Sequence, residues 1–269
     1  MLYNPKLIFK FLLKNFLNLF GIKINKKKIQ EIFENTKFKD FTLDDFISHV
    51  FSNKDLSIVQ IGANDGESGD PINQYLKNHS GKVILIEAVP YYCKILEKIY
   101  QDKDNIVISN TLISNDTTSK DFFYIDPSVA DEMDGNGPMN KWAHGQGSLN
   151  KETIIYWINK NKFRGSTYRK NIKKYINSIK KININTKPLN QIVMENGLID
   201  GFDLLLLDVQ GHEYEVLKNL EYMKKLPKYI IYEDDSSLSR GDSRSTWLLL
   251  KSLGYFNLID DHDNLWIKV

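Results

Sequence analysis

The chain has 269 residues, of which 42% are hydrophobic and 26% charged, so it can form one large domain with a short appendage and is not wholly disordered. Its formal net charge of +2 gives no overall attraction to nucleic acid or to a membrane. The single cysteine, Cys93, excludes an internal disulfide and a cysteine zinc cluster, and together with the lack of about 20 uninterrupted apolar residues it predicts a cytoplasmic protein.

Residues 1–54 form a predicted helical appendage. Its first part places apolar side chains at helical spacing with lysines between them: Leu7, Phe11, Leu12, Phe16, Leu19 and Phe20, with Lys6, Lys10 and Lys14. One interpretation is an interfacial helix that makes peripheral contact with anionic lipid at the inner face of the membrane. The other, which we favour, is a helix packed on the rest of the chain or on a second copy in a homo-oligomer.

Strands and helices alternate along residues 55–269, the predicted main domain. In its first part we expect strands at 57–61, 83–87 and 106–113, and helices at 71–78, with Asp70 as N-cap, and at 91–100. Two successive strand–helix–strand units predict a buried parallel sheet, because parallel strands need a crossover connection.

An insertion is predicted at about 126–185, after an extra strand at 120–125. Residues 131–150 lose all periodicity and are rich in glycine, which is typical of a lid or binding loop. Helices are expected at 153–160 and 168–180.

The segment from Lys160 to Lys187 carries ten basic residues and no acidic one: Lys160, Lys162, Arg164, Arg169, Lys170, Lys173, Lys174, Lys180, Lys181 and Lys187. Such a run is often a solvated helical face. The functional alternative is a patch for an anionic substrate, such as a nucleotide-linked or phospholipid-linked sugar. Nucleic acid is a weaker interpretation, because no binding motif accompanies the charge.

The last part of the chain resumes the alternation. Four consecutive leucines predict a strand at 203–208 that is buried on both faces. After it we expect a helix at 213–225, a strand at 229–233, a helix at 244–253, and two strands, 255–259 and 264–269, in a hairpin-like connection. The whole pattern predicts an α/β fold with helices on both faces of a mostly parallel sheet.

Two motifs follow the first two strands. Gly62 and Gly66 flank a turn in which the backbone can approach a ligand, and the amides of the next helix are available as donors. Glu87 ends the second strand, where a carboxylate commonly accepts hydrogen bonds from both ribose hydroxyls. The spacing also suits a nicotinamide dinucleotide, but the Gly-x-Gly-x-x-Gly pattern is absent, which favours a ligand with no pyrophosphate.

A third motif follows the leucine strand. Asp208 ends that strand and is expected to face the same crevice as Gly62 and Glu87. Gly211 permits a tight turn, and Glu213 falls in the first turn of the next helix, where capping alone would explain a carboxylate.

Four motifs together resemble the FkbM family of methyltransferases: Ile61-Gly-Ala-Asn-Asp-Gly66, Glu87-Ala-Val-Pro90, Asn185-Thr-Lys-Pro-Leu-Asn190 and Asp208-Val-Gln-Gly-His-Glu213. The resemblance covers roughly residues 57–235. It implies a class I methyltransferase, Rossmann-like fold with an antiparallel seventh strand, and S-adenosyl-L-methionine as cofactor. The cofactor-binding residues that it implies are Gln60, Gly62, Ala63, Asn64, Gly66, Glu87, Ala88 and Asp208, with Asp208 near the methyl group. The sequence departs from the family at Gln60, where an acid is common, and at Gln210, where Glu is common.

Methyl transfer to a hydroxyl oxygen requires help in removing the proton of the acceptor. His212 is the first candidate for the base, although a histidine at a helix start is equally often structural; Asp208 and His144 are the other candidates. Alternatively, Asp208 could hold Mg²⁺ together with one of the next acids, Glu233, Asp234 or Asp235, which could instead only cap a helix.

The expected acceptor is a sugar hydroxyl in surface-polysaccharide or glycolipid synthesis. In the lid, Trp142, Gln146 and Ser148 suit stacking and hydroxyl recognition, although Trp142 could simply anchor the loop. Two alternatives stay open: a methyltransferase that acts on a small metabolite, and a catalytically silent Rossmann-like module that serves in assembly.

Overall fold

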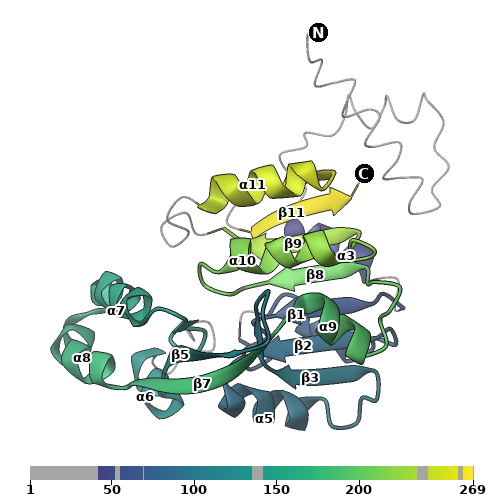
Figure 1. The fold of residues 1–269 in the computed structure, drawn as a ribbon. Helices are drawn as coiled ribbons and strands as arrows, with labels where there is room; N and C mark the ends of the chain where they lie inside the picture. Colours follow the sequence, from purple (N-terminus) through teal and green to yellow (C-terminus); the bar gives the residue numbers. More distant parts are fainter. Residues whose placement is uncertain are drawn as a thin grey trace, which may run out of the picture.

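A seven-stranded sheet forms the centre of the molecule. The computed structural model describes residues 42–51, 55–68, 70–134, 142–234, 242–259 and 263–268. The strand order is β10-β11-β9-β8-β1-β2-β3 (Figure 1). The strands are β1 (Ile58–Ile61), β2 (Val83–Glu87), β3 (Ile106–Asn110), β8 (Leu204–Leu207), β9 (Tyr229–Glu233), β10 (Tyr255–Ile259) and β11 (Asp263–Lys268).

Only β11 runs against its neighbours in this sheet. It lies between β9 and β10 and is antiparallel to both, whereas β3, β2, β1, β8 and β9 pair in parallel. This arrangement is the class I methyltransferase fold that the sequence predicted. β11 pairs antiparallel with β10, the strand that precedes it in the chain, so the chain direction is reversed between these two strands.

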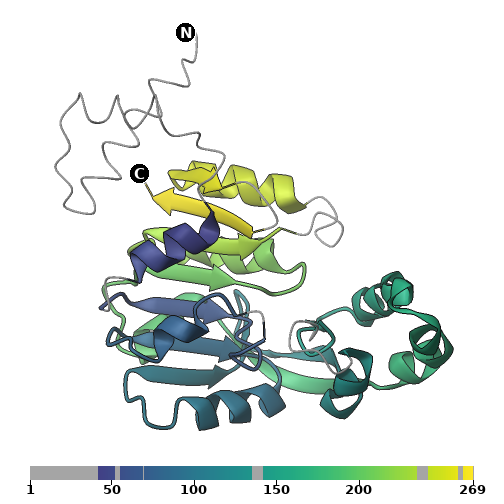
Figure 2. The same cartoon turned by 180° about the vertical axis from the view of Figure 1, so that it is seen from behind.

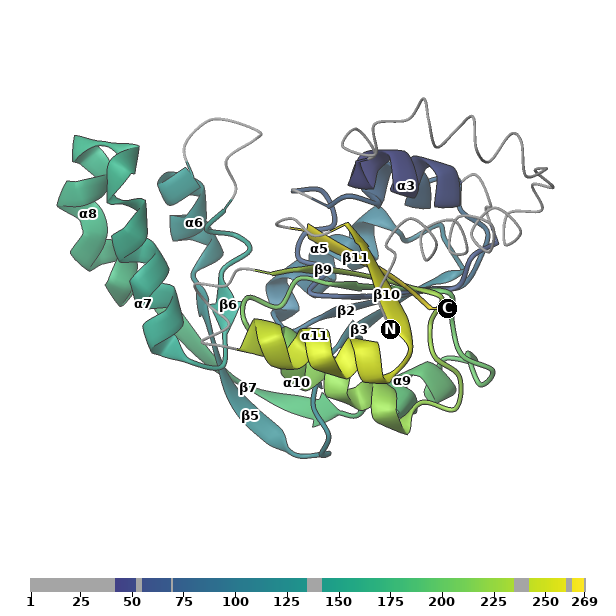
Figure 3. The ribbon, with the colours of Figure 1, turned by 90° about the horizontal axis from the view of Figure 1, so that it is seen from above.

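Helices cover both faces of the sheet (Figure 3). One face carries α3 (Leu43–Val50), α4 (Asn73–Leu76) and α5 (Pro90–Ile99); the other carries α9 (Leu189–Glu195), α10 (Glu213–Leu217) and α11 (Asp242–Ser252). Successive residues of a strand point to opposite faces, so Ile58 and Leu204 pack with the first set and Val59 and Leu205 with the second. Coverage on both sides explains why β1 and β8 are buried along their whole length and why every residue in them except Gln60 is apolar.

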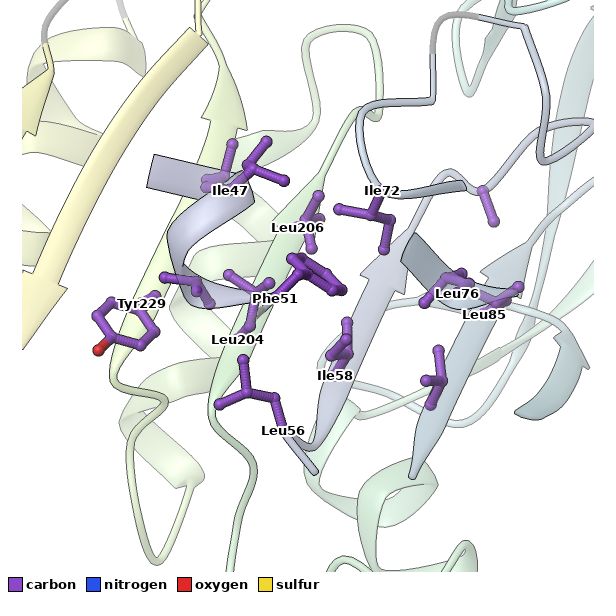
Figure 4. Packing of buried hydrophobic residues seen from close by; sticks show 14 of the residues in the cluster. Ile47, Phe51, Leu56, Ile58, Ile72, Leu76, Leu85, Leu204, Leu206 and Tyr229 are labelled. Atoms are coloured by element: carbon purple, nitrogen blue, oxygen red, sulfur yellow. The ribbon is translucent and has the colours of Figure 1, made fainter. Parts of the chain in front are cut away.

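Helix α3 belongs to this core. Phe46 is 0% exposed and its ring contacts Tyr229 edge-on at 5.2 Å. Ile47 and Phe51 of this region belong to one apolar cluster with Ile58, Leu204 and Leu206, all labelled in Figure 4. Thr42 and Asp45 begin the helix with reciprocal hydrogen bonds between side chain and amide, which satisfy donors that the first turn leaves open. A division of the chain at residue 54 stays a prediction, and the amphipathic segment of residues 7–20 lies outside the described residues.

The second unit, residues 112–187, is called the insertion here. It contains a small sheet of order β4-β7-β5-β6 and projects to one side of the main sheet (Figures 1 and 2). Its elements are β4 (Leu112–Ile113), β5 (Ser119–Ile125), α6 (Pro127–Asp134), β6 (Gly147–Ser148), α7 (Lys151–Lys160), the 3₁₀ turn η2 (Asn161–Arg164), α8 (Ser166–Asn177) and β7 (Ile179–Lys187). A separate apolar cluster, which includes Ile125, Ile158 and Tyr175, holds it together.

Several expected elements differ in extent. The strand expected at 106–113 is divided at Thr111, whose hydroxyl donates to the Asn185 carbonyl, so the chain leaves β3 and joins β7 through β4. The helix expected to reach residue 180 ends at Asn177, because β7 begins at Ile179 and pairs with β5 over seven residues.

The remaining differences shorten helices or add order. The helix expected at 71–78 is the single turn α4, although Asp70 accepts from the amides of Ile72 and Asn73 as an N-cap does. The helix expected at 213–225 is α10 followed by the 3₁₀ turn η3 (Lys218–Tyr222). Within the loop expected at 131–150, α6 ends at Asp134 and β6 forms, while 135–141 lie outside the described residues.

Candidate active site

Three turns that are distant in sequence meet at one edge of the main sheet. Gly62 follows β1, Glu87 ends β2 and Asp208 follows β8, and β1 lies between the other two strands. The Gly62 amide donates to the Ile86 carbonyl at 2.9 Å, and the Asp208 amide donates to the Ile61 carbonyl at 3.0 Å. All three turns line one cavity of about 260 Å³, which lies near the lower end of small-molecule sites, roughly 300–1,000 Å³.

The glycines of the first turn serve the protein's own packing. Gly62 has a φ of +82°, and a Cβ there would lie 1.8 Å from the carbonyl oxygen of Asp208. A Cβ on Gly66 would lie 2.6 Å from a methyl carbon of Leu96 in α5. These glycines were expected to let the backbone approach a ligand; in the structure they allow two strand ends and one helix to approach the turn.

Glu87 links the first turn to the second. Its carboxylate accepts from the amides of Asn64 at 2.9 Å and Val89 at 2.7 Å. Burial raises the pKa of Glu87 to about 7, against the effect of these hydrogen bonds, which lower it. The Glu87 carboxylate therefore stabilises the two turns and also lies in the cavity wall, where it can accept a hydrogen bond from a ligand.

One buried polar atom at this edge has no hydrogen-bond partner among the described residues. The Asn64 side-chain oxygen is buried without a hydrogen bond, and Asn64 lines the cavity. An acceptor left in this state costs roughly 1–3 kcal/mol, which a ligand N–H or O–H would recover. Beside the Glu87 carboxylate, this atom makes the edge suitable for a ligand that carries hydroxyl or amine donors, as S-adenosyl-L-methionine does.

The third turn is held by Glu213. Its carboxylate accepts from the amides of Gly211 at 3.1 Å and Val209 at 3.3 Å, and burial raises its pKa to about 7. Gln210 lies between these two residues with a φ of +52°, a conformation uncommon outside glycine. Glu213 thus sits in the first turn of α10, as expected, and fixes the segment before it.

The two candidate histidines differ in their surroundings. His212 lines the cavity at the start of α10, its ring has no hydrogen bond to any described residue, and burial lowers its pKa. His144 is buried, with Nδ1 at 3.1 Å from the Tyr92 hydroxyl and Nε2 at 2.9 Å from Asp131. Both ring nitrogens of His144 are engaged, so His212 is the better placed to accept a proton.

The sequence-predicted cofactor residues divide into two groups. Gly62, Asn64, Glu87, Ala88 and Asp208 line the cavity. The lining does not include the other three, Gln60, Ala63 and Gly66.

Gln60 lies behind the first turn. Its amide nitrogen donates to Asp70 at 3.2 Å, and its buried oxygen has no hydrogen-bond partner within the segments that the structure describes. Gln60 therefore stabilises the turn from behind and does not line the cavity.

The acids proposed for a metal are not grouped as metal ligands. The Gln210 amide lies between Asp208 and Glu233 and donates to both, while Asp234 accepts from the Ser243 hydroxyl at 2.6 Å. Asp235 lies outside the described residues. Within the described segments, no three His, Cys, Asp or Glu side chains form a group that could hold a metal ion.

The insertion supplies the opposite wall of the cavity. Its lining side chains are Leu112, Ile113, Phe122, His144, Gln146, Ser148, Leu149, Asn150 and Thr153, of which His144, Gln146 and Ser148 were expected from the sequence. Trp142, expected as a stacking platform, is not in the lining; its ring lies 5.2 Å from the Arg164 guanidinium and 6.5 Å from the Tyr168 ring, and it anchors the loop.

The lining residues that sequence reasoning missed come from several elements. They include Tyr92, Thr111, Phe122, Asn150, Thr153 and Asp242. Tyr92 lies two residues after Pro90 of the second motif, a proximity that could have identified it. Phe122 and Thr153 carry no such signal, because only the pairing of β5 with β6 and β7 brings them to the cavity.

The basic segment is partly neutralised by the fold. Lys180 pairs with Asp126 at 3.3 Å, Lys181 with Asp121 at 2.7 Å and Lys187 with Glu195 at 2.7 Å, and Lys174 pairs with Glu132. The cavity lining contains no lysine or arginine of the described chain. The charge asymmetry in the sequence therefore does not become a cationic binding site at this edge.

Known proteins provide an independent comparison. An FkbM methyltransferase from Methylobacillus flagellatus is 13% identical with a TM-score of 0.44, over 80% of this chain, which spans only 44% of that one. An O-methyltransferase from Bacillus cereus in complex with S-adenosylhomocysteine is 8% identical with a TM-score of 0.37, over 100% of this chain and 93% of that one. No curated protein matches the chain.

The family is established by a match along most of the sequence. Residues 60–256 match the family model described as the Methyltransferase FkbM domain, and this range contains all four motifs and the three turns of the cavity. The chain belongs to the FkbM family of S-adenosylmethionine-dependent methyltransferases.

Proposed function

We propose that this methyltransferase acts on a neutral hydroxyl group of a sugar, as an O-methyltransferase in surface-polysaccharide or glycolipid synthesis. The observation that carries the proposal is the composition of the acceptor wall. Gln146, Ser148, Asn150 and Thr153 supply neutral hydrogen-bonding groups, and Phe122 supplies an aromatic ring. Such a combination suits a polyhydroxylated ring with one apolar face.

The opposite wall suits the cofactor. Asn64 and Glu87 would receive donors of the nucleoside or of the methionine part, and Gly62 and Ala88 would border them. When bound, S-adenosyl-L-methionine supplies an activated methyl group. The two walls would place donor and acceptor in one enclosed space, and such positioning is worth roughly 7–11 kcal/mol in favourable cases.

His212 is proposed as the base. Burial lowers its pKa, so the ring is neutral at pH 7 and can take the proton of the acceptor hydroxyl. Asp208, on the same turn and also in the lining, would orient the acceptor by accepting a hydrogen bond. His144, held by Tyr92 and Asp131, would position the loop rather than move a proton.

The lining also limits where an anionic acceptor could carry its charge. The described lining includes the acids Glu87, Asp208 and Asp242 and no cation, so a phosphate within the cavity would be repelled. Any nucleotide or phospholipid attached to the sugar would have to extend beyond the cavity. Among the described residues, no helix is long and apolar enough to cross a membrane.

Two experiments test the proposal. Calorimetry with S-adenosylhomocysteine measures the cofactor site, and binding of nothing would support the silent assembly module. Incubation with S-adenosyl-L-methionine and a panel of neutral sugars, sugar phosphates, small amines and small phenols, followed by mass spectrometry, measures the acceptor class. Methylation confined to amines or phenols would overturn the sugar assignment.

The base is tested on the acceptor that the panel identifies. His212→Ala should lower kcat by roughly 10²–10⁴-fold and leave the affinity for S-adenosylhomocysteine unchanged. His79→Gln, a buried histidine that bonds the Leu56 carbonyl far from the cavity lining, serves as the comparison. A His212→Ala enzyme with unchanged kcat would exclude His212 as the base.

A further inference from the structure

Two carboxyl groups lie at the ends of neighbouring strands, at the edge of the main sheet that borders the cavity; this edge is called the active edge below. β8 and β9 pair in parallel with Leu207 opposite Tyr232, so the next residues, Asp208 and Glu233, are adjacent at the sheet edge. Two adjacent carboxylates repel each other, and such a pair is commonly held together by a compensating group, such as a proton or a metal ion.

The side chain of Gln210 occupies the position of such a compensating group. Its amide nitrogen donates to Asp208 Oδ1 at 2.7 Å and to Glu233 Oε2 at 3.1 Å, so one nitrogen bridges the two acids. Its amide oxygen accepts from the side-chain nitrogen of Gln146 at 3.2 Å. Both N–H groups are used, and the oxygen connects this edge to the insertion.

The backbone around Gln210 is held in place independently. Gln210 has a φ of +52°, and the flanking amides of Val209 and Gly211 both donate to the buried Glu213 carboxylate. A non-glycine residue keeps such a conformation only where its surroundings determine it. The turn therefore aims the Gln210 side chain between the two acids.

We propose that Gln210 is a positioning residue that replaces a divalent cation between Asp208 and Glu233 and fastens the insertion to the sheet edge through Gln146. The inference rests on the proposed methyl transfer for its catalytic meaning, but its structural content is independent of the acceptor. A carboxylate at position 210 would face two others, and three convergent acids form a typical oxygen-ligand set for Mg²⁺ or Mn²⁺. The amide makes that cation unnecessary.

Metal titration of the Gln210→Glu variant tests the replacement directly. MgCl₂ and MnCl₂ are titrated into wild type, Gln210→Glu and the matched control Gln74→Glu, which makes the same charge change on the exposed surface of α4. Calorimetry and melting temperature are the readouts. We expect saturable binding and a rise in melting temperature only for Gln210→Glu.

Two results would overturn the replacement. One is saturable metal binding by the wild type; the other is a Gln210→Glu protein that responds to metal no more than the control does. If Gln210→Glu does not fold without metal, recovery of its folded signal on refolding with MnCl₂ supports the proposal, and no recovery refutes it.

Kinetics on the identified acceptor separate positioning from general structure. Gln210→Glu should lose at least about 10-fold in kcat in EDTA and regain it with Mg²⁺, while Gln146→Leu should raise KM for the acceptor and leave S-adenosylhomocysteine affinity unchanged. A Gln210→Glu enzyme that keeps the wild-type rate in EDTA would refute the inference. If no acceptor is methylated at all, the proposed function fails, whereas the metal titration still decides the role of Gln210.

Discussion

The substitution Gly62→Ala tests the packing that forms the active edge. An added Cβ would lie 1.8 Å from the carbonyl oxygen and 2.8 Å from the carbonyl carbon of Asp208. These are backbone atoms at the end of β8, so no side chain can rotate away to relieve the overlap. The ends of β1 and β8 would have to separate, which strains the hydrogen bond from the Asp208 amide to the Ile61 carbonyl.

The loss of stability in Gly62→Ala can be estimated by comparison with Gly197, a glycine that has a similar φ but free space around the position of its Cβ. Gly197 has a φ of +79° and nothing within 4 Å of its added Cβ, so Gly197→Ala should cost only the conformational term, about 1–2 kcal/mol. Gly62→Ala, at φ +82°, carries the same term plus an overlap of roughly 1–3 kcal/mol, for a total of about 2–5 kcal/mol.

Urea unfolding of the two variants beside wild type measures this difference. Gly62→Ala should unfold at a clearly lower urea concentration than Gly197→Ala, and its affinity for S-adenosylhomocysteine should fall because the turn shifts. Equal free energies of unfolding for the two variants would show that the first turn has room for a methyl group, and that the close approach of β1 and β8 is not what requires glycine.

Three further predictions concern buried groups. Glu87 and Glu213 have a pKa of about 7 in the folded protein and an ordinary value near 4.5 when unfolded, so their contribution to stability is lost as pH rises through 7. The free energy of unfolding should therefore fall by about 1–3 kcal/mol per group between pH 5 and pH 8. Urea unfolding measures this fall, which should be smaller in Glu213→Gln than in wild type. Glu87→Gln should weaken S-adenosylhomocysteine binding by roughly 10–100-fold in calorimetry, because one acceptor becomes a donor, whereas Glu97→Gln on the exposed side of α5 should not. Phe46→Ala should lower the free energy of unfolding by about 3–5 kcal/mol, and a loss below about 1 kcal/mol would show that α3 is separable from the sheet.

The strands of the main sheet could be predicted because a strand that is buried on both faces appears in the sequence as a short, nearly continuous apolar run. β2 and β9 have the predicted limits, 83–87 and 229–233, since each is a short apolar run that ends in a glutamate at the active edge. The parallel direction of the first strands followed from crossover connections, and the antiparallel seventh strand followed from the family resemblance of the four motifs. The meeting of Gly62, Glu87 and Asp208 was then a consequence of parallel pairing.

Elements of the insertion were less predictable. β7 contains Ile182, Ile184 and Thr186 on one face, an alternation that predicts a strand, but the lysines before it continued the helical pattern of α8. The break at Thr111 depends on a hydrogen bond to Asn185, which is 74 residues away. Local sequence patterns contain no information about such a partner.

Charge was the least reliable guide to the site, and the structure explains why. The basic segment loses much of its effect because β5 and α6 bring Asp121, Asp126 and Glu132 to its lysines. The acids at the active edge show the converse: Glu87 and Glu213 are compensated by backbone amides, and the Asp208–Glu233 pair by one amide side chain. In both regions the compensating partner comes from another element or from the backbone. A residue's charge therefore indicates its function only when the groups that neutralise it are known, and those groups are determined by the fold.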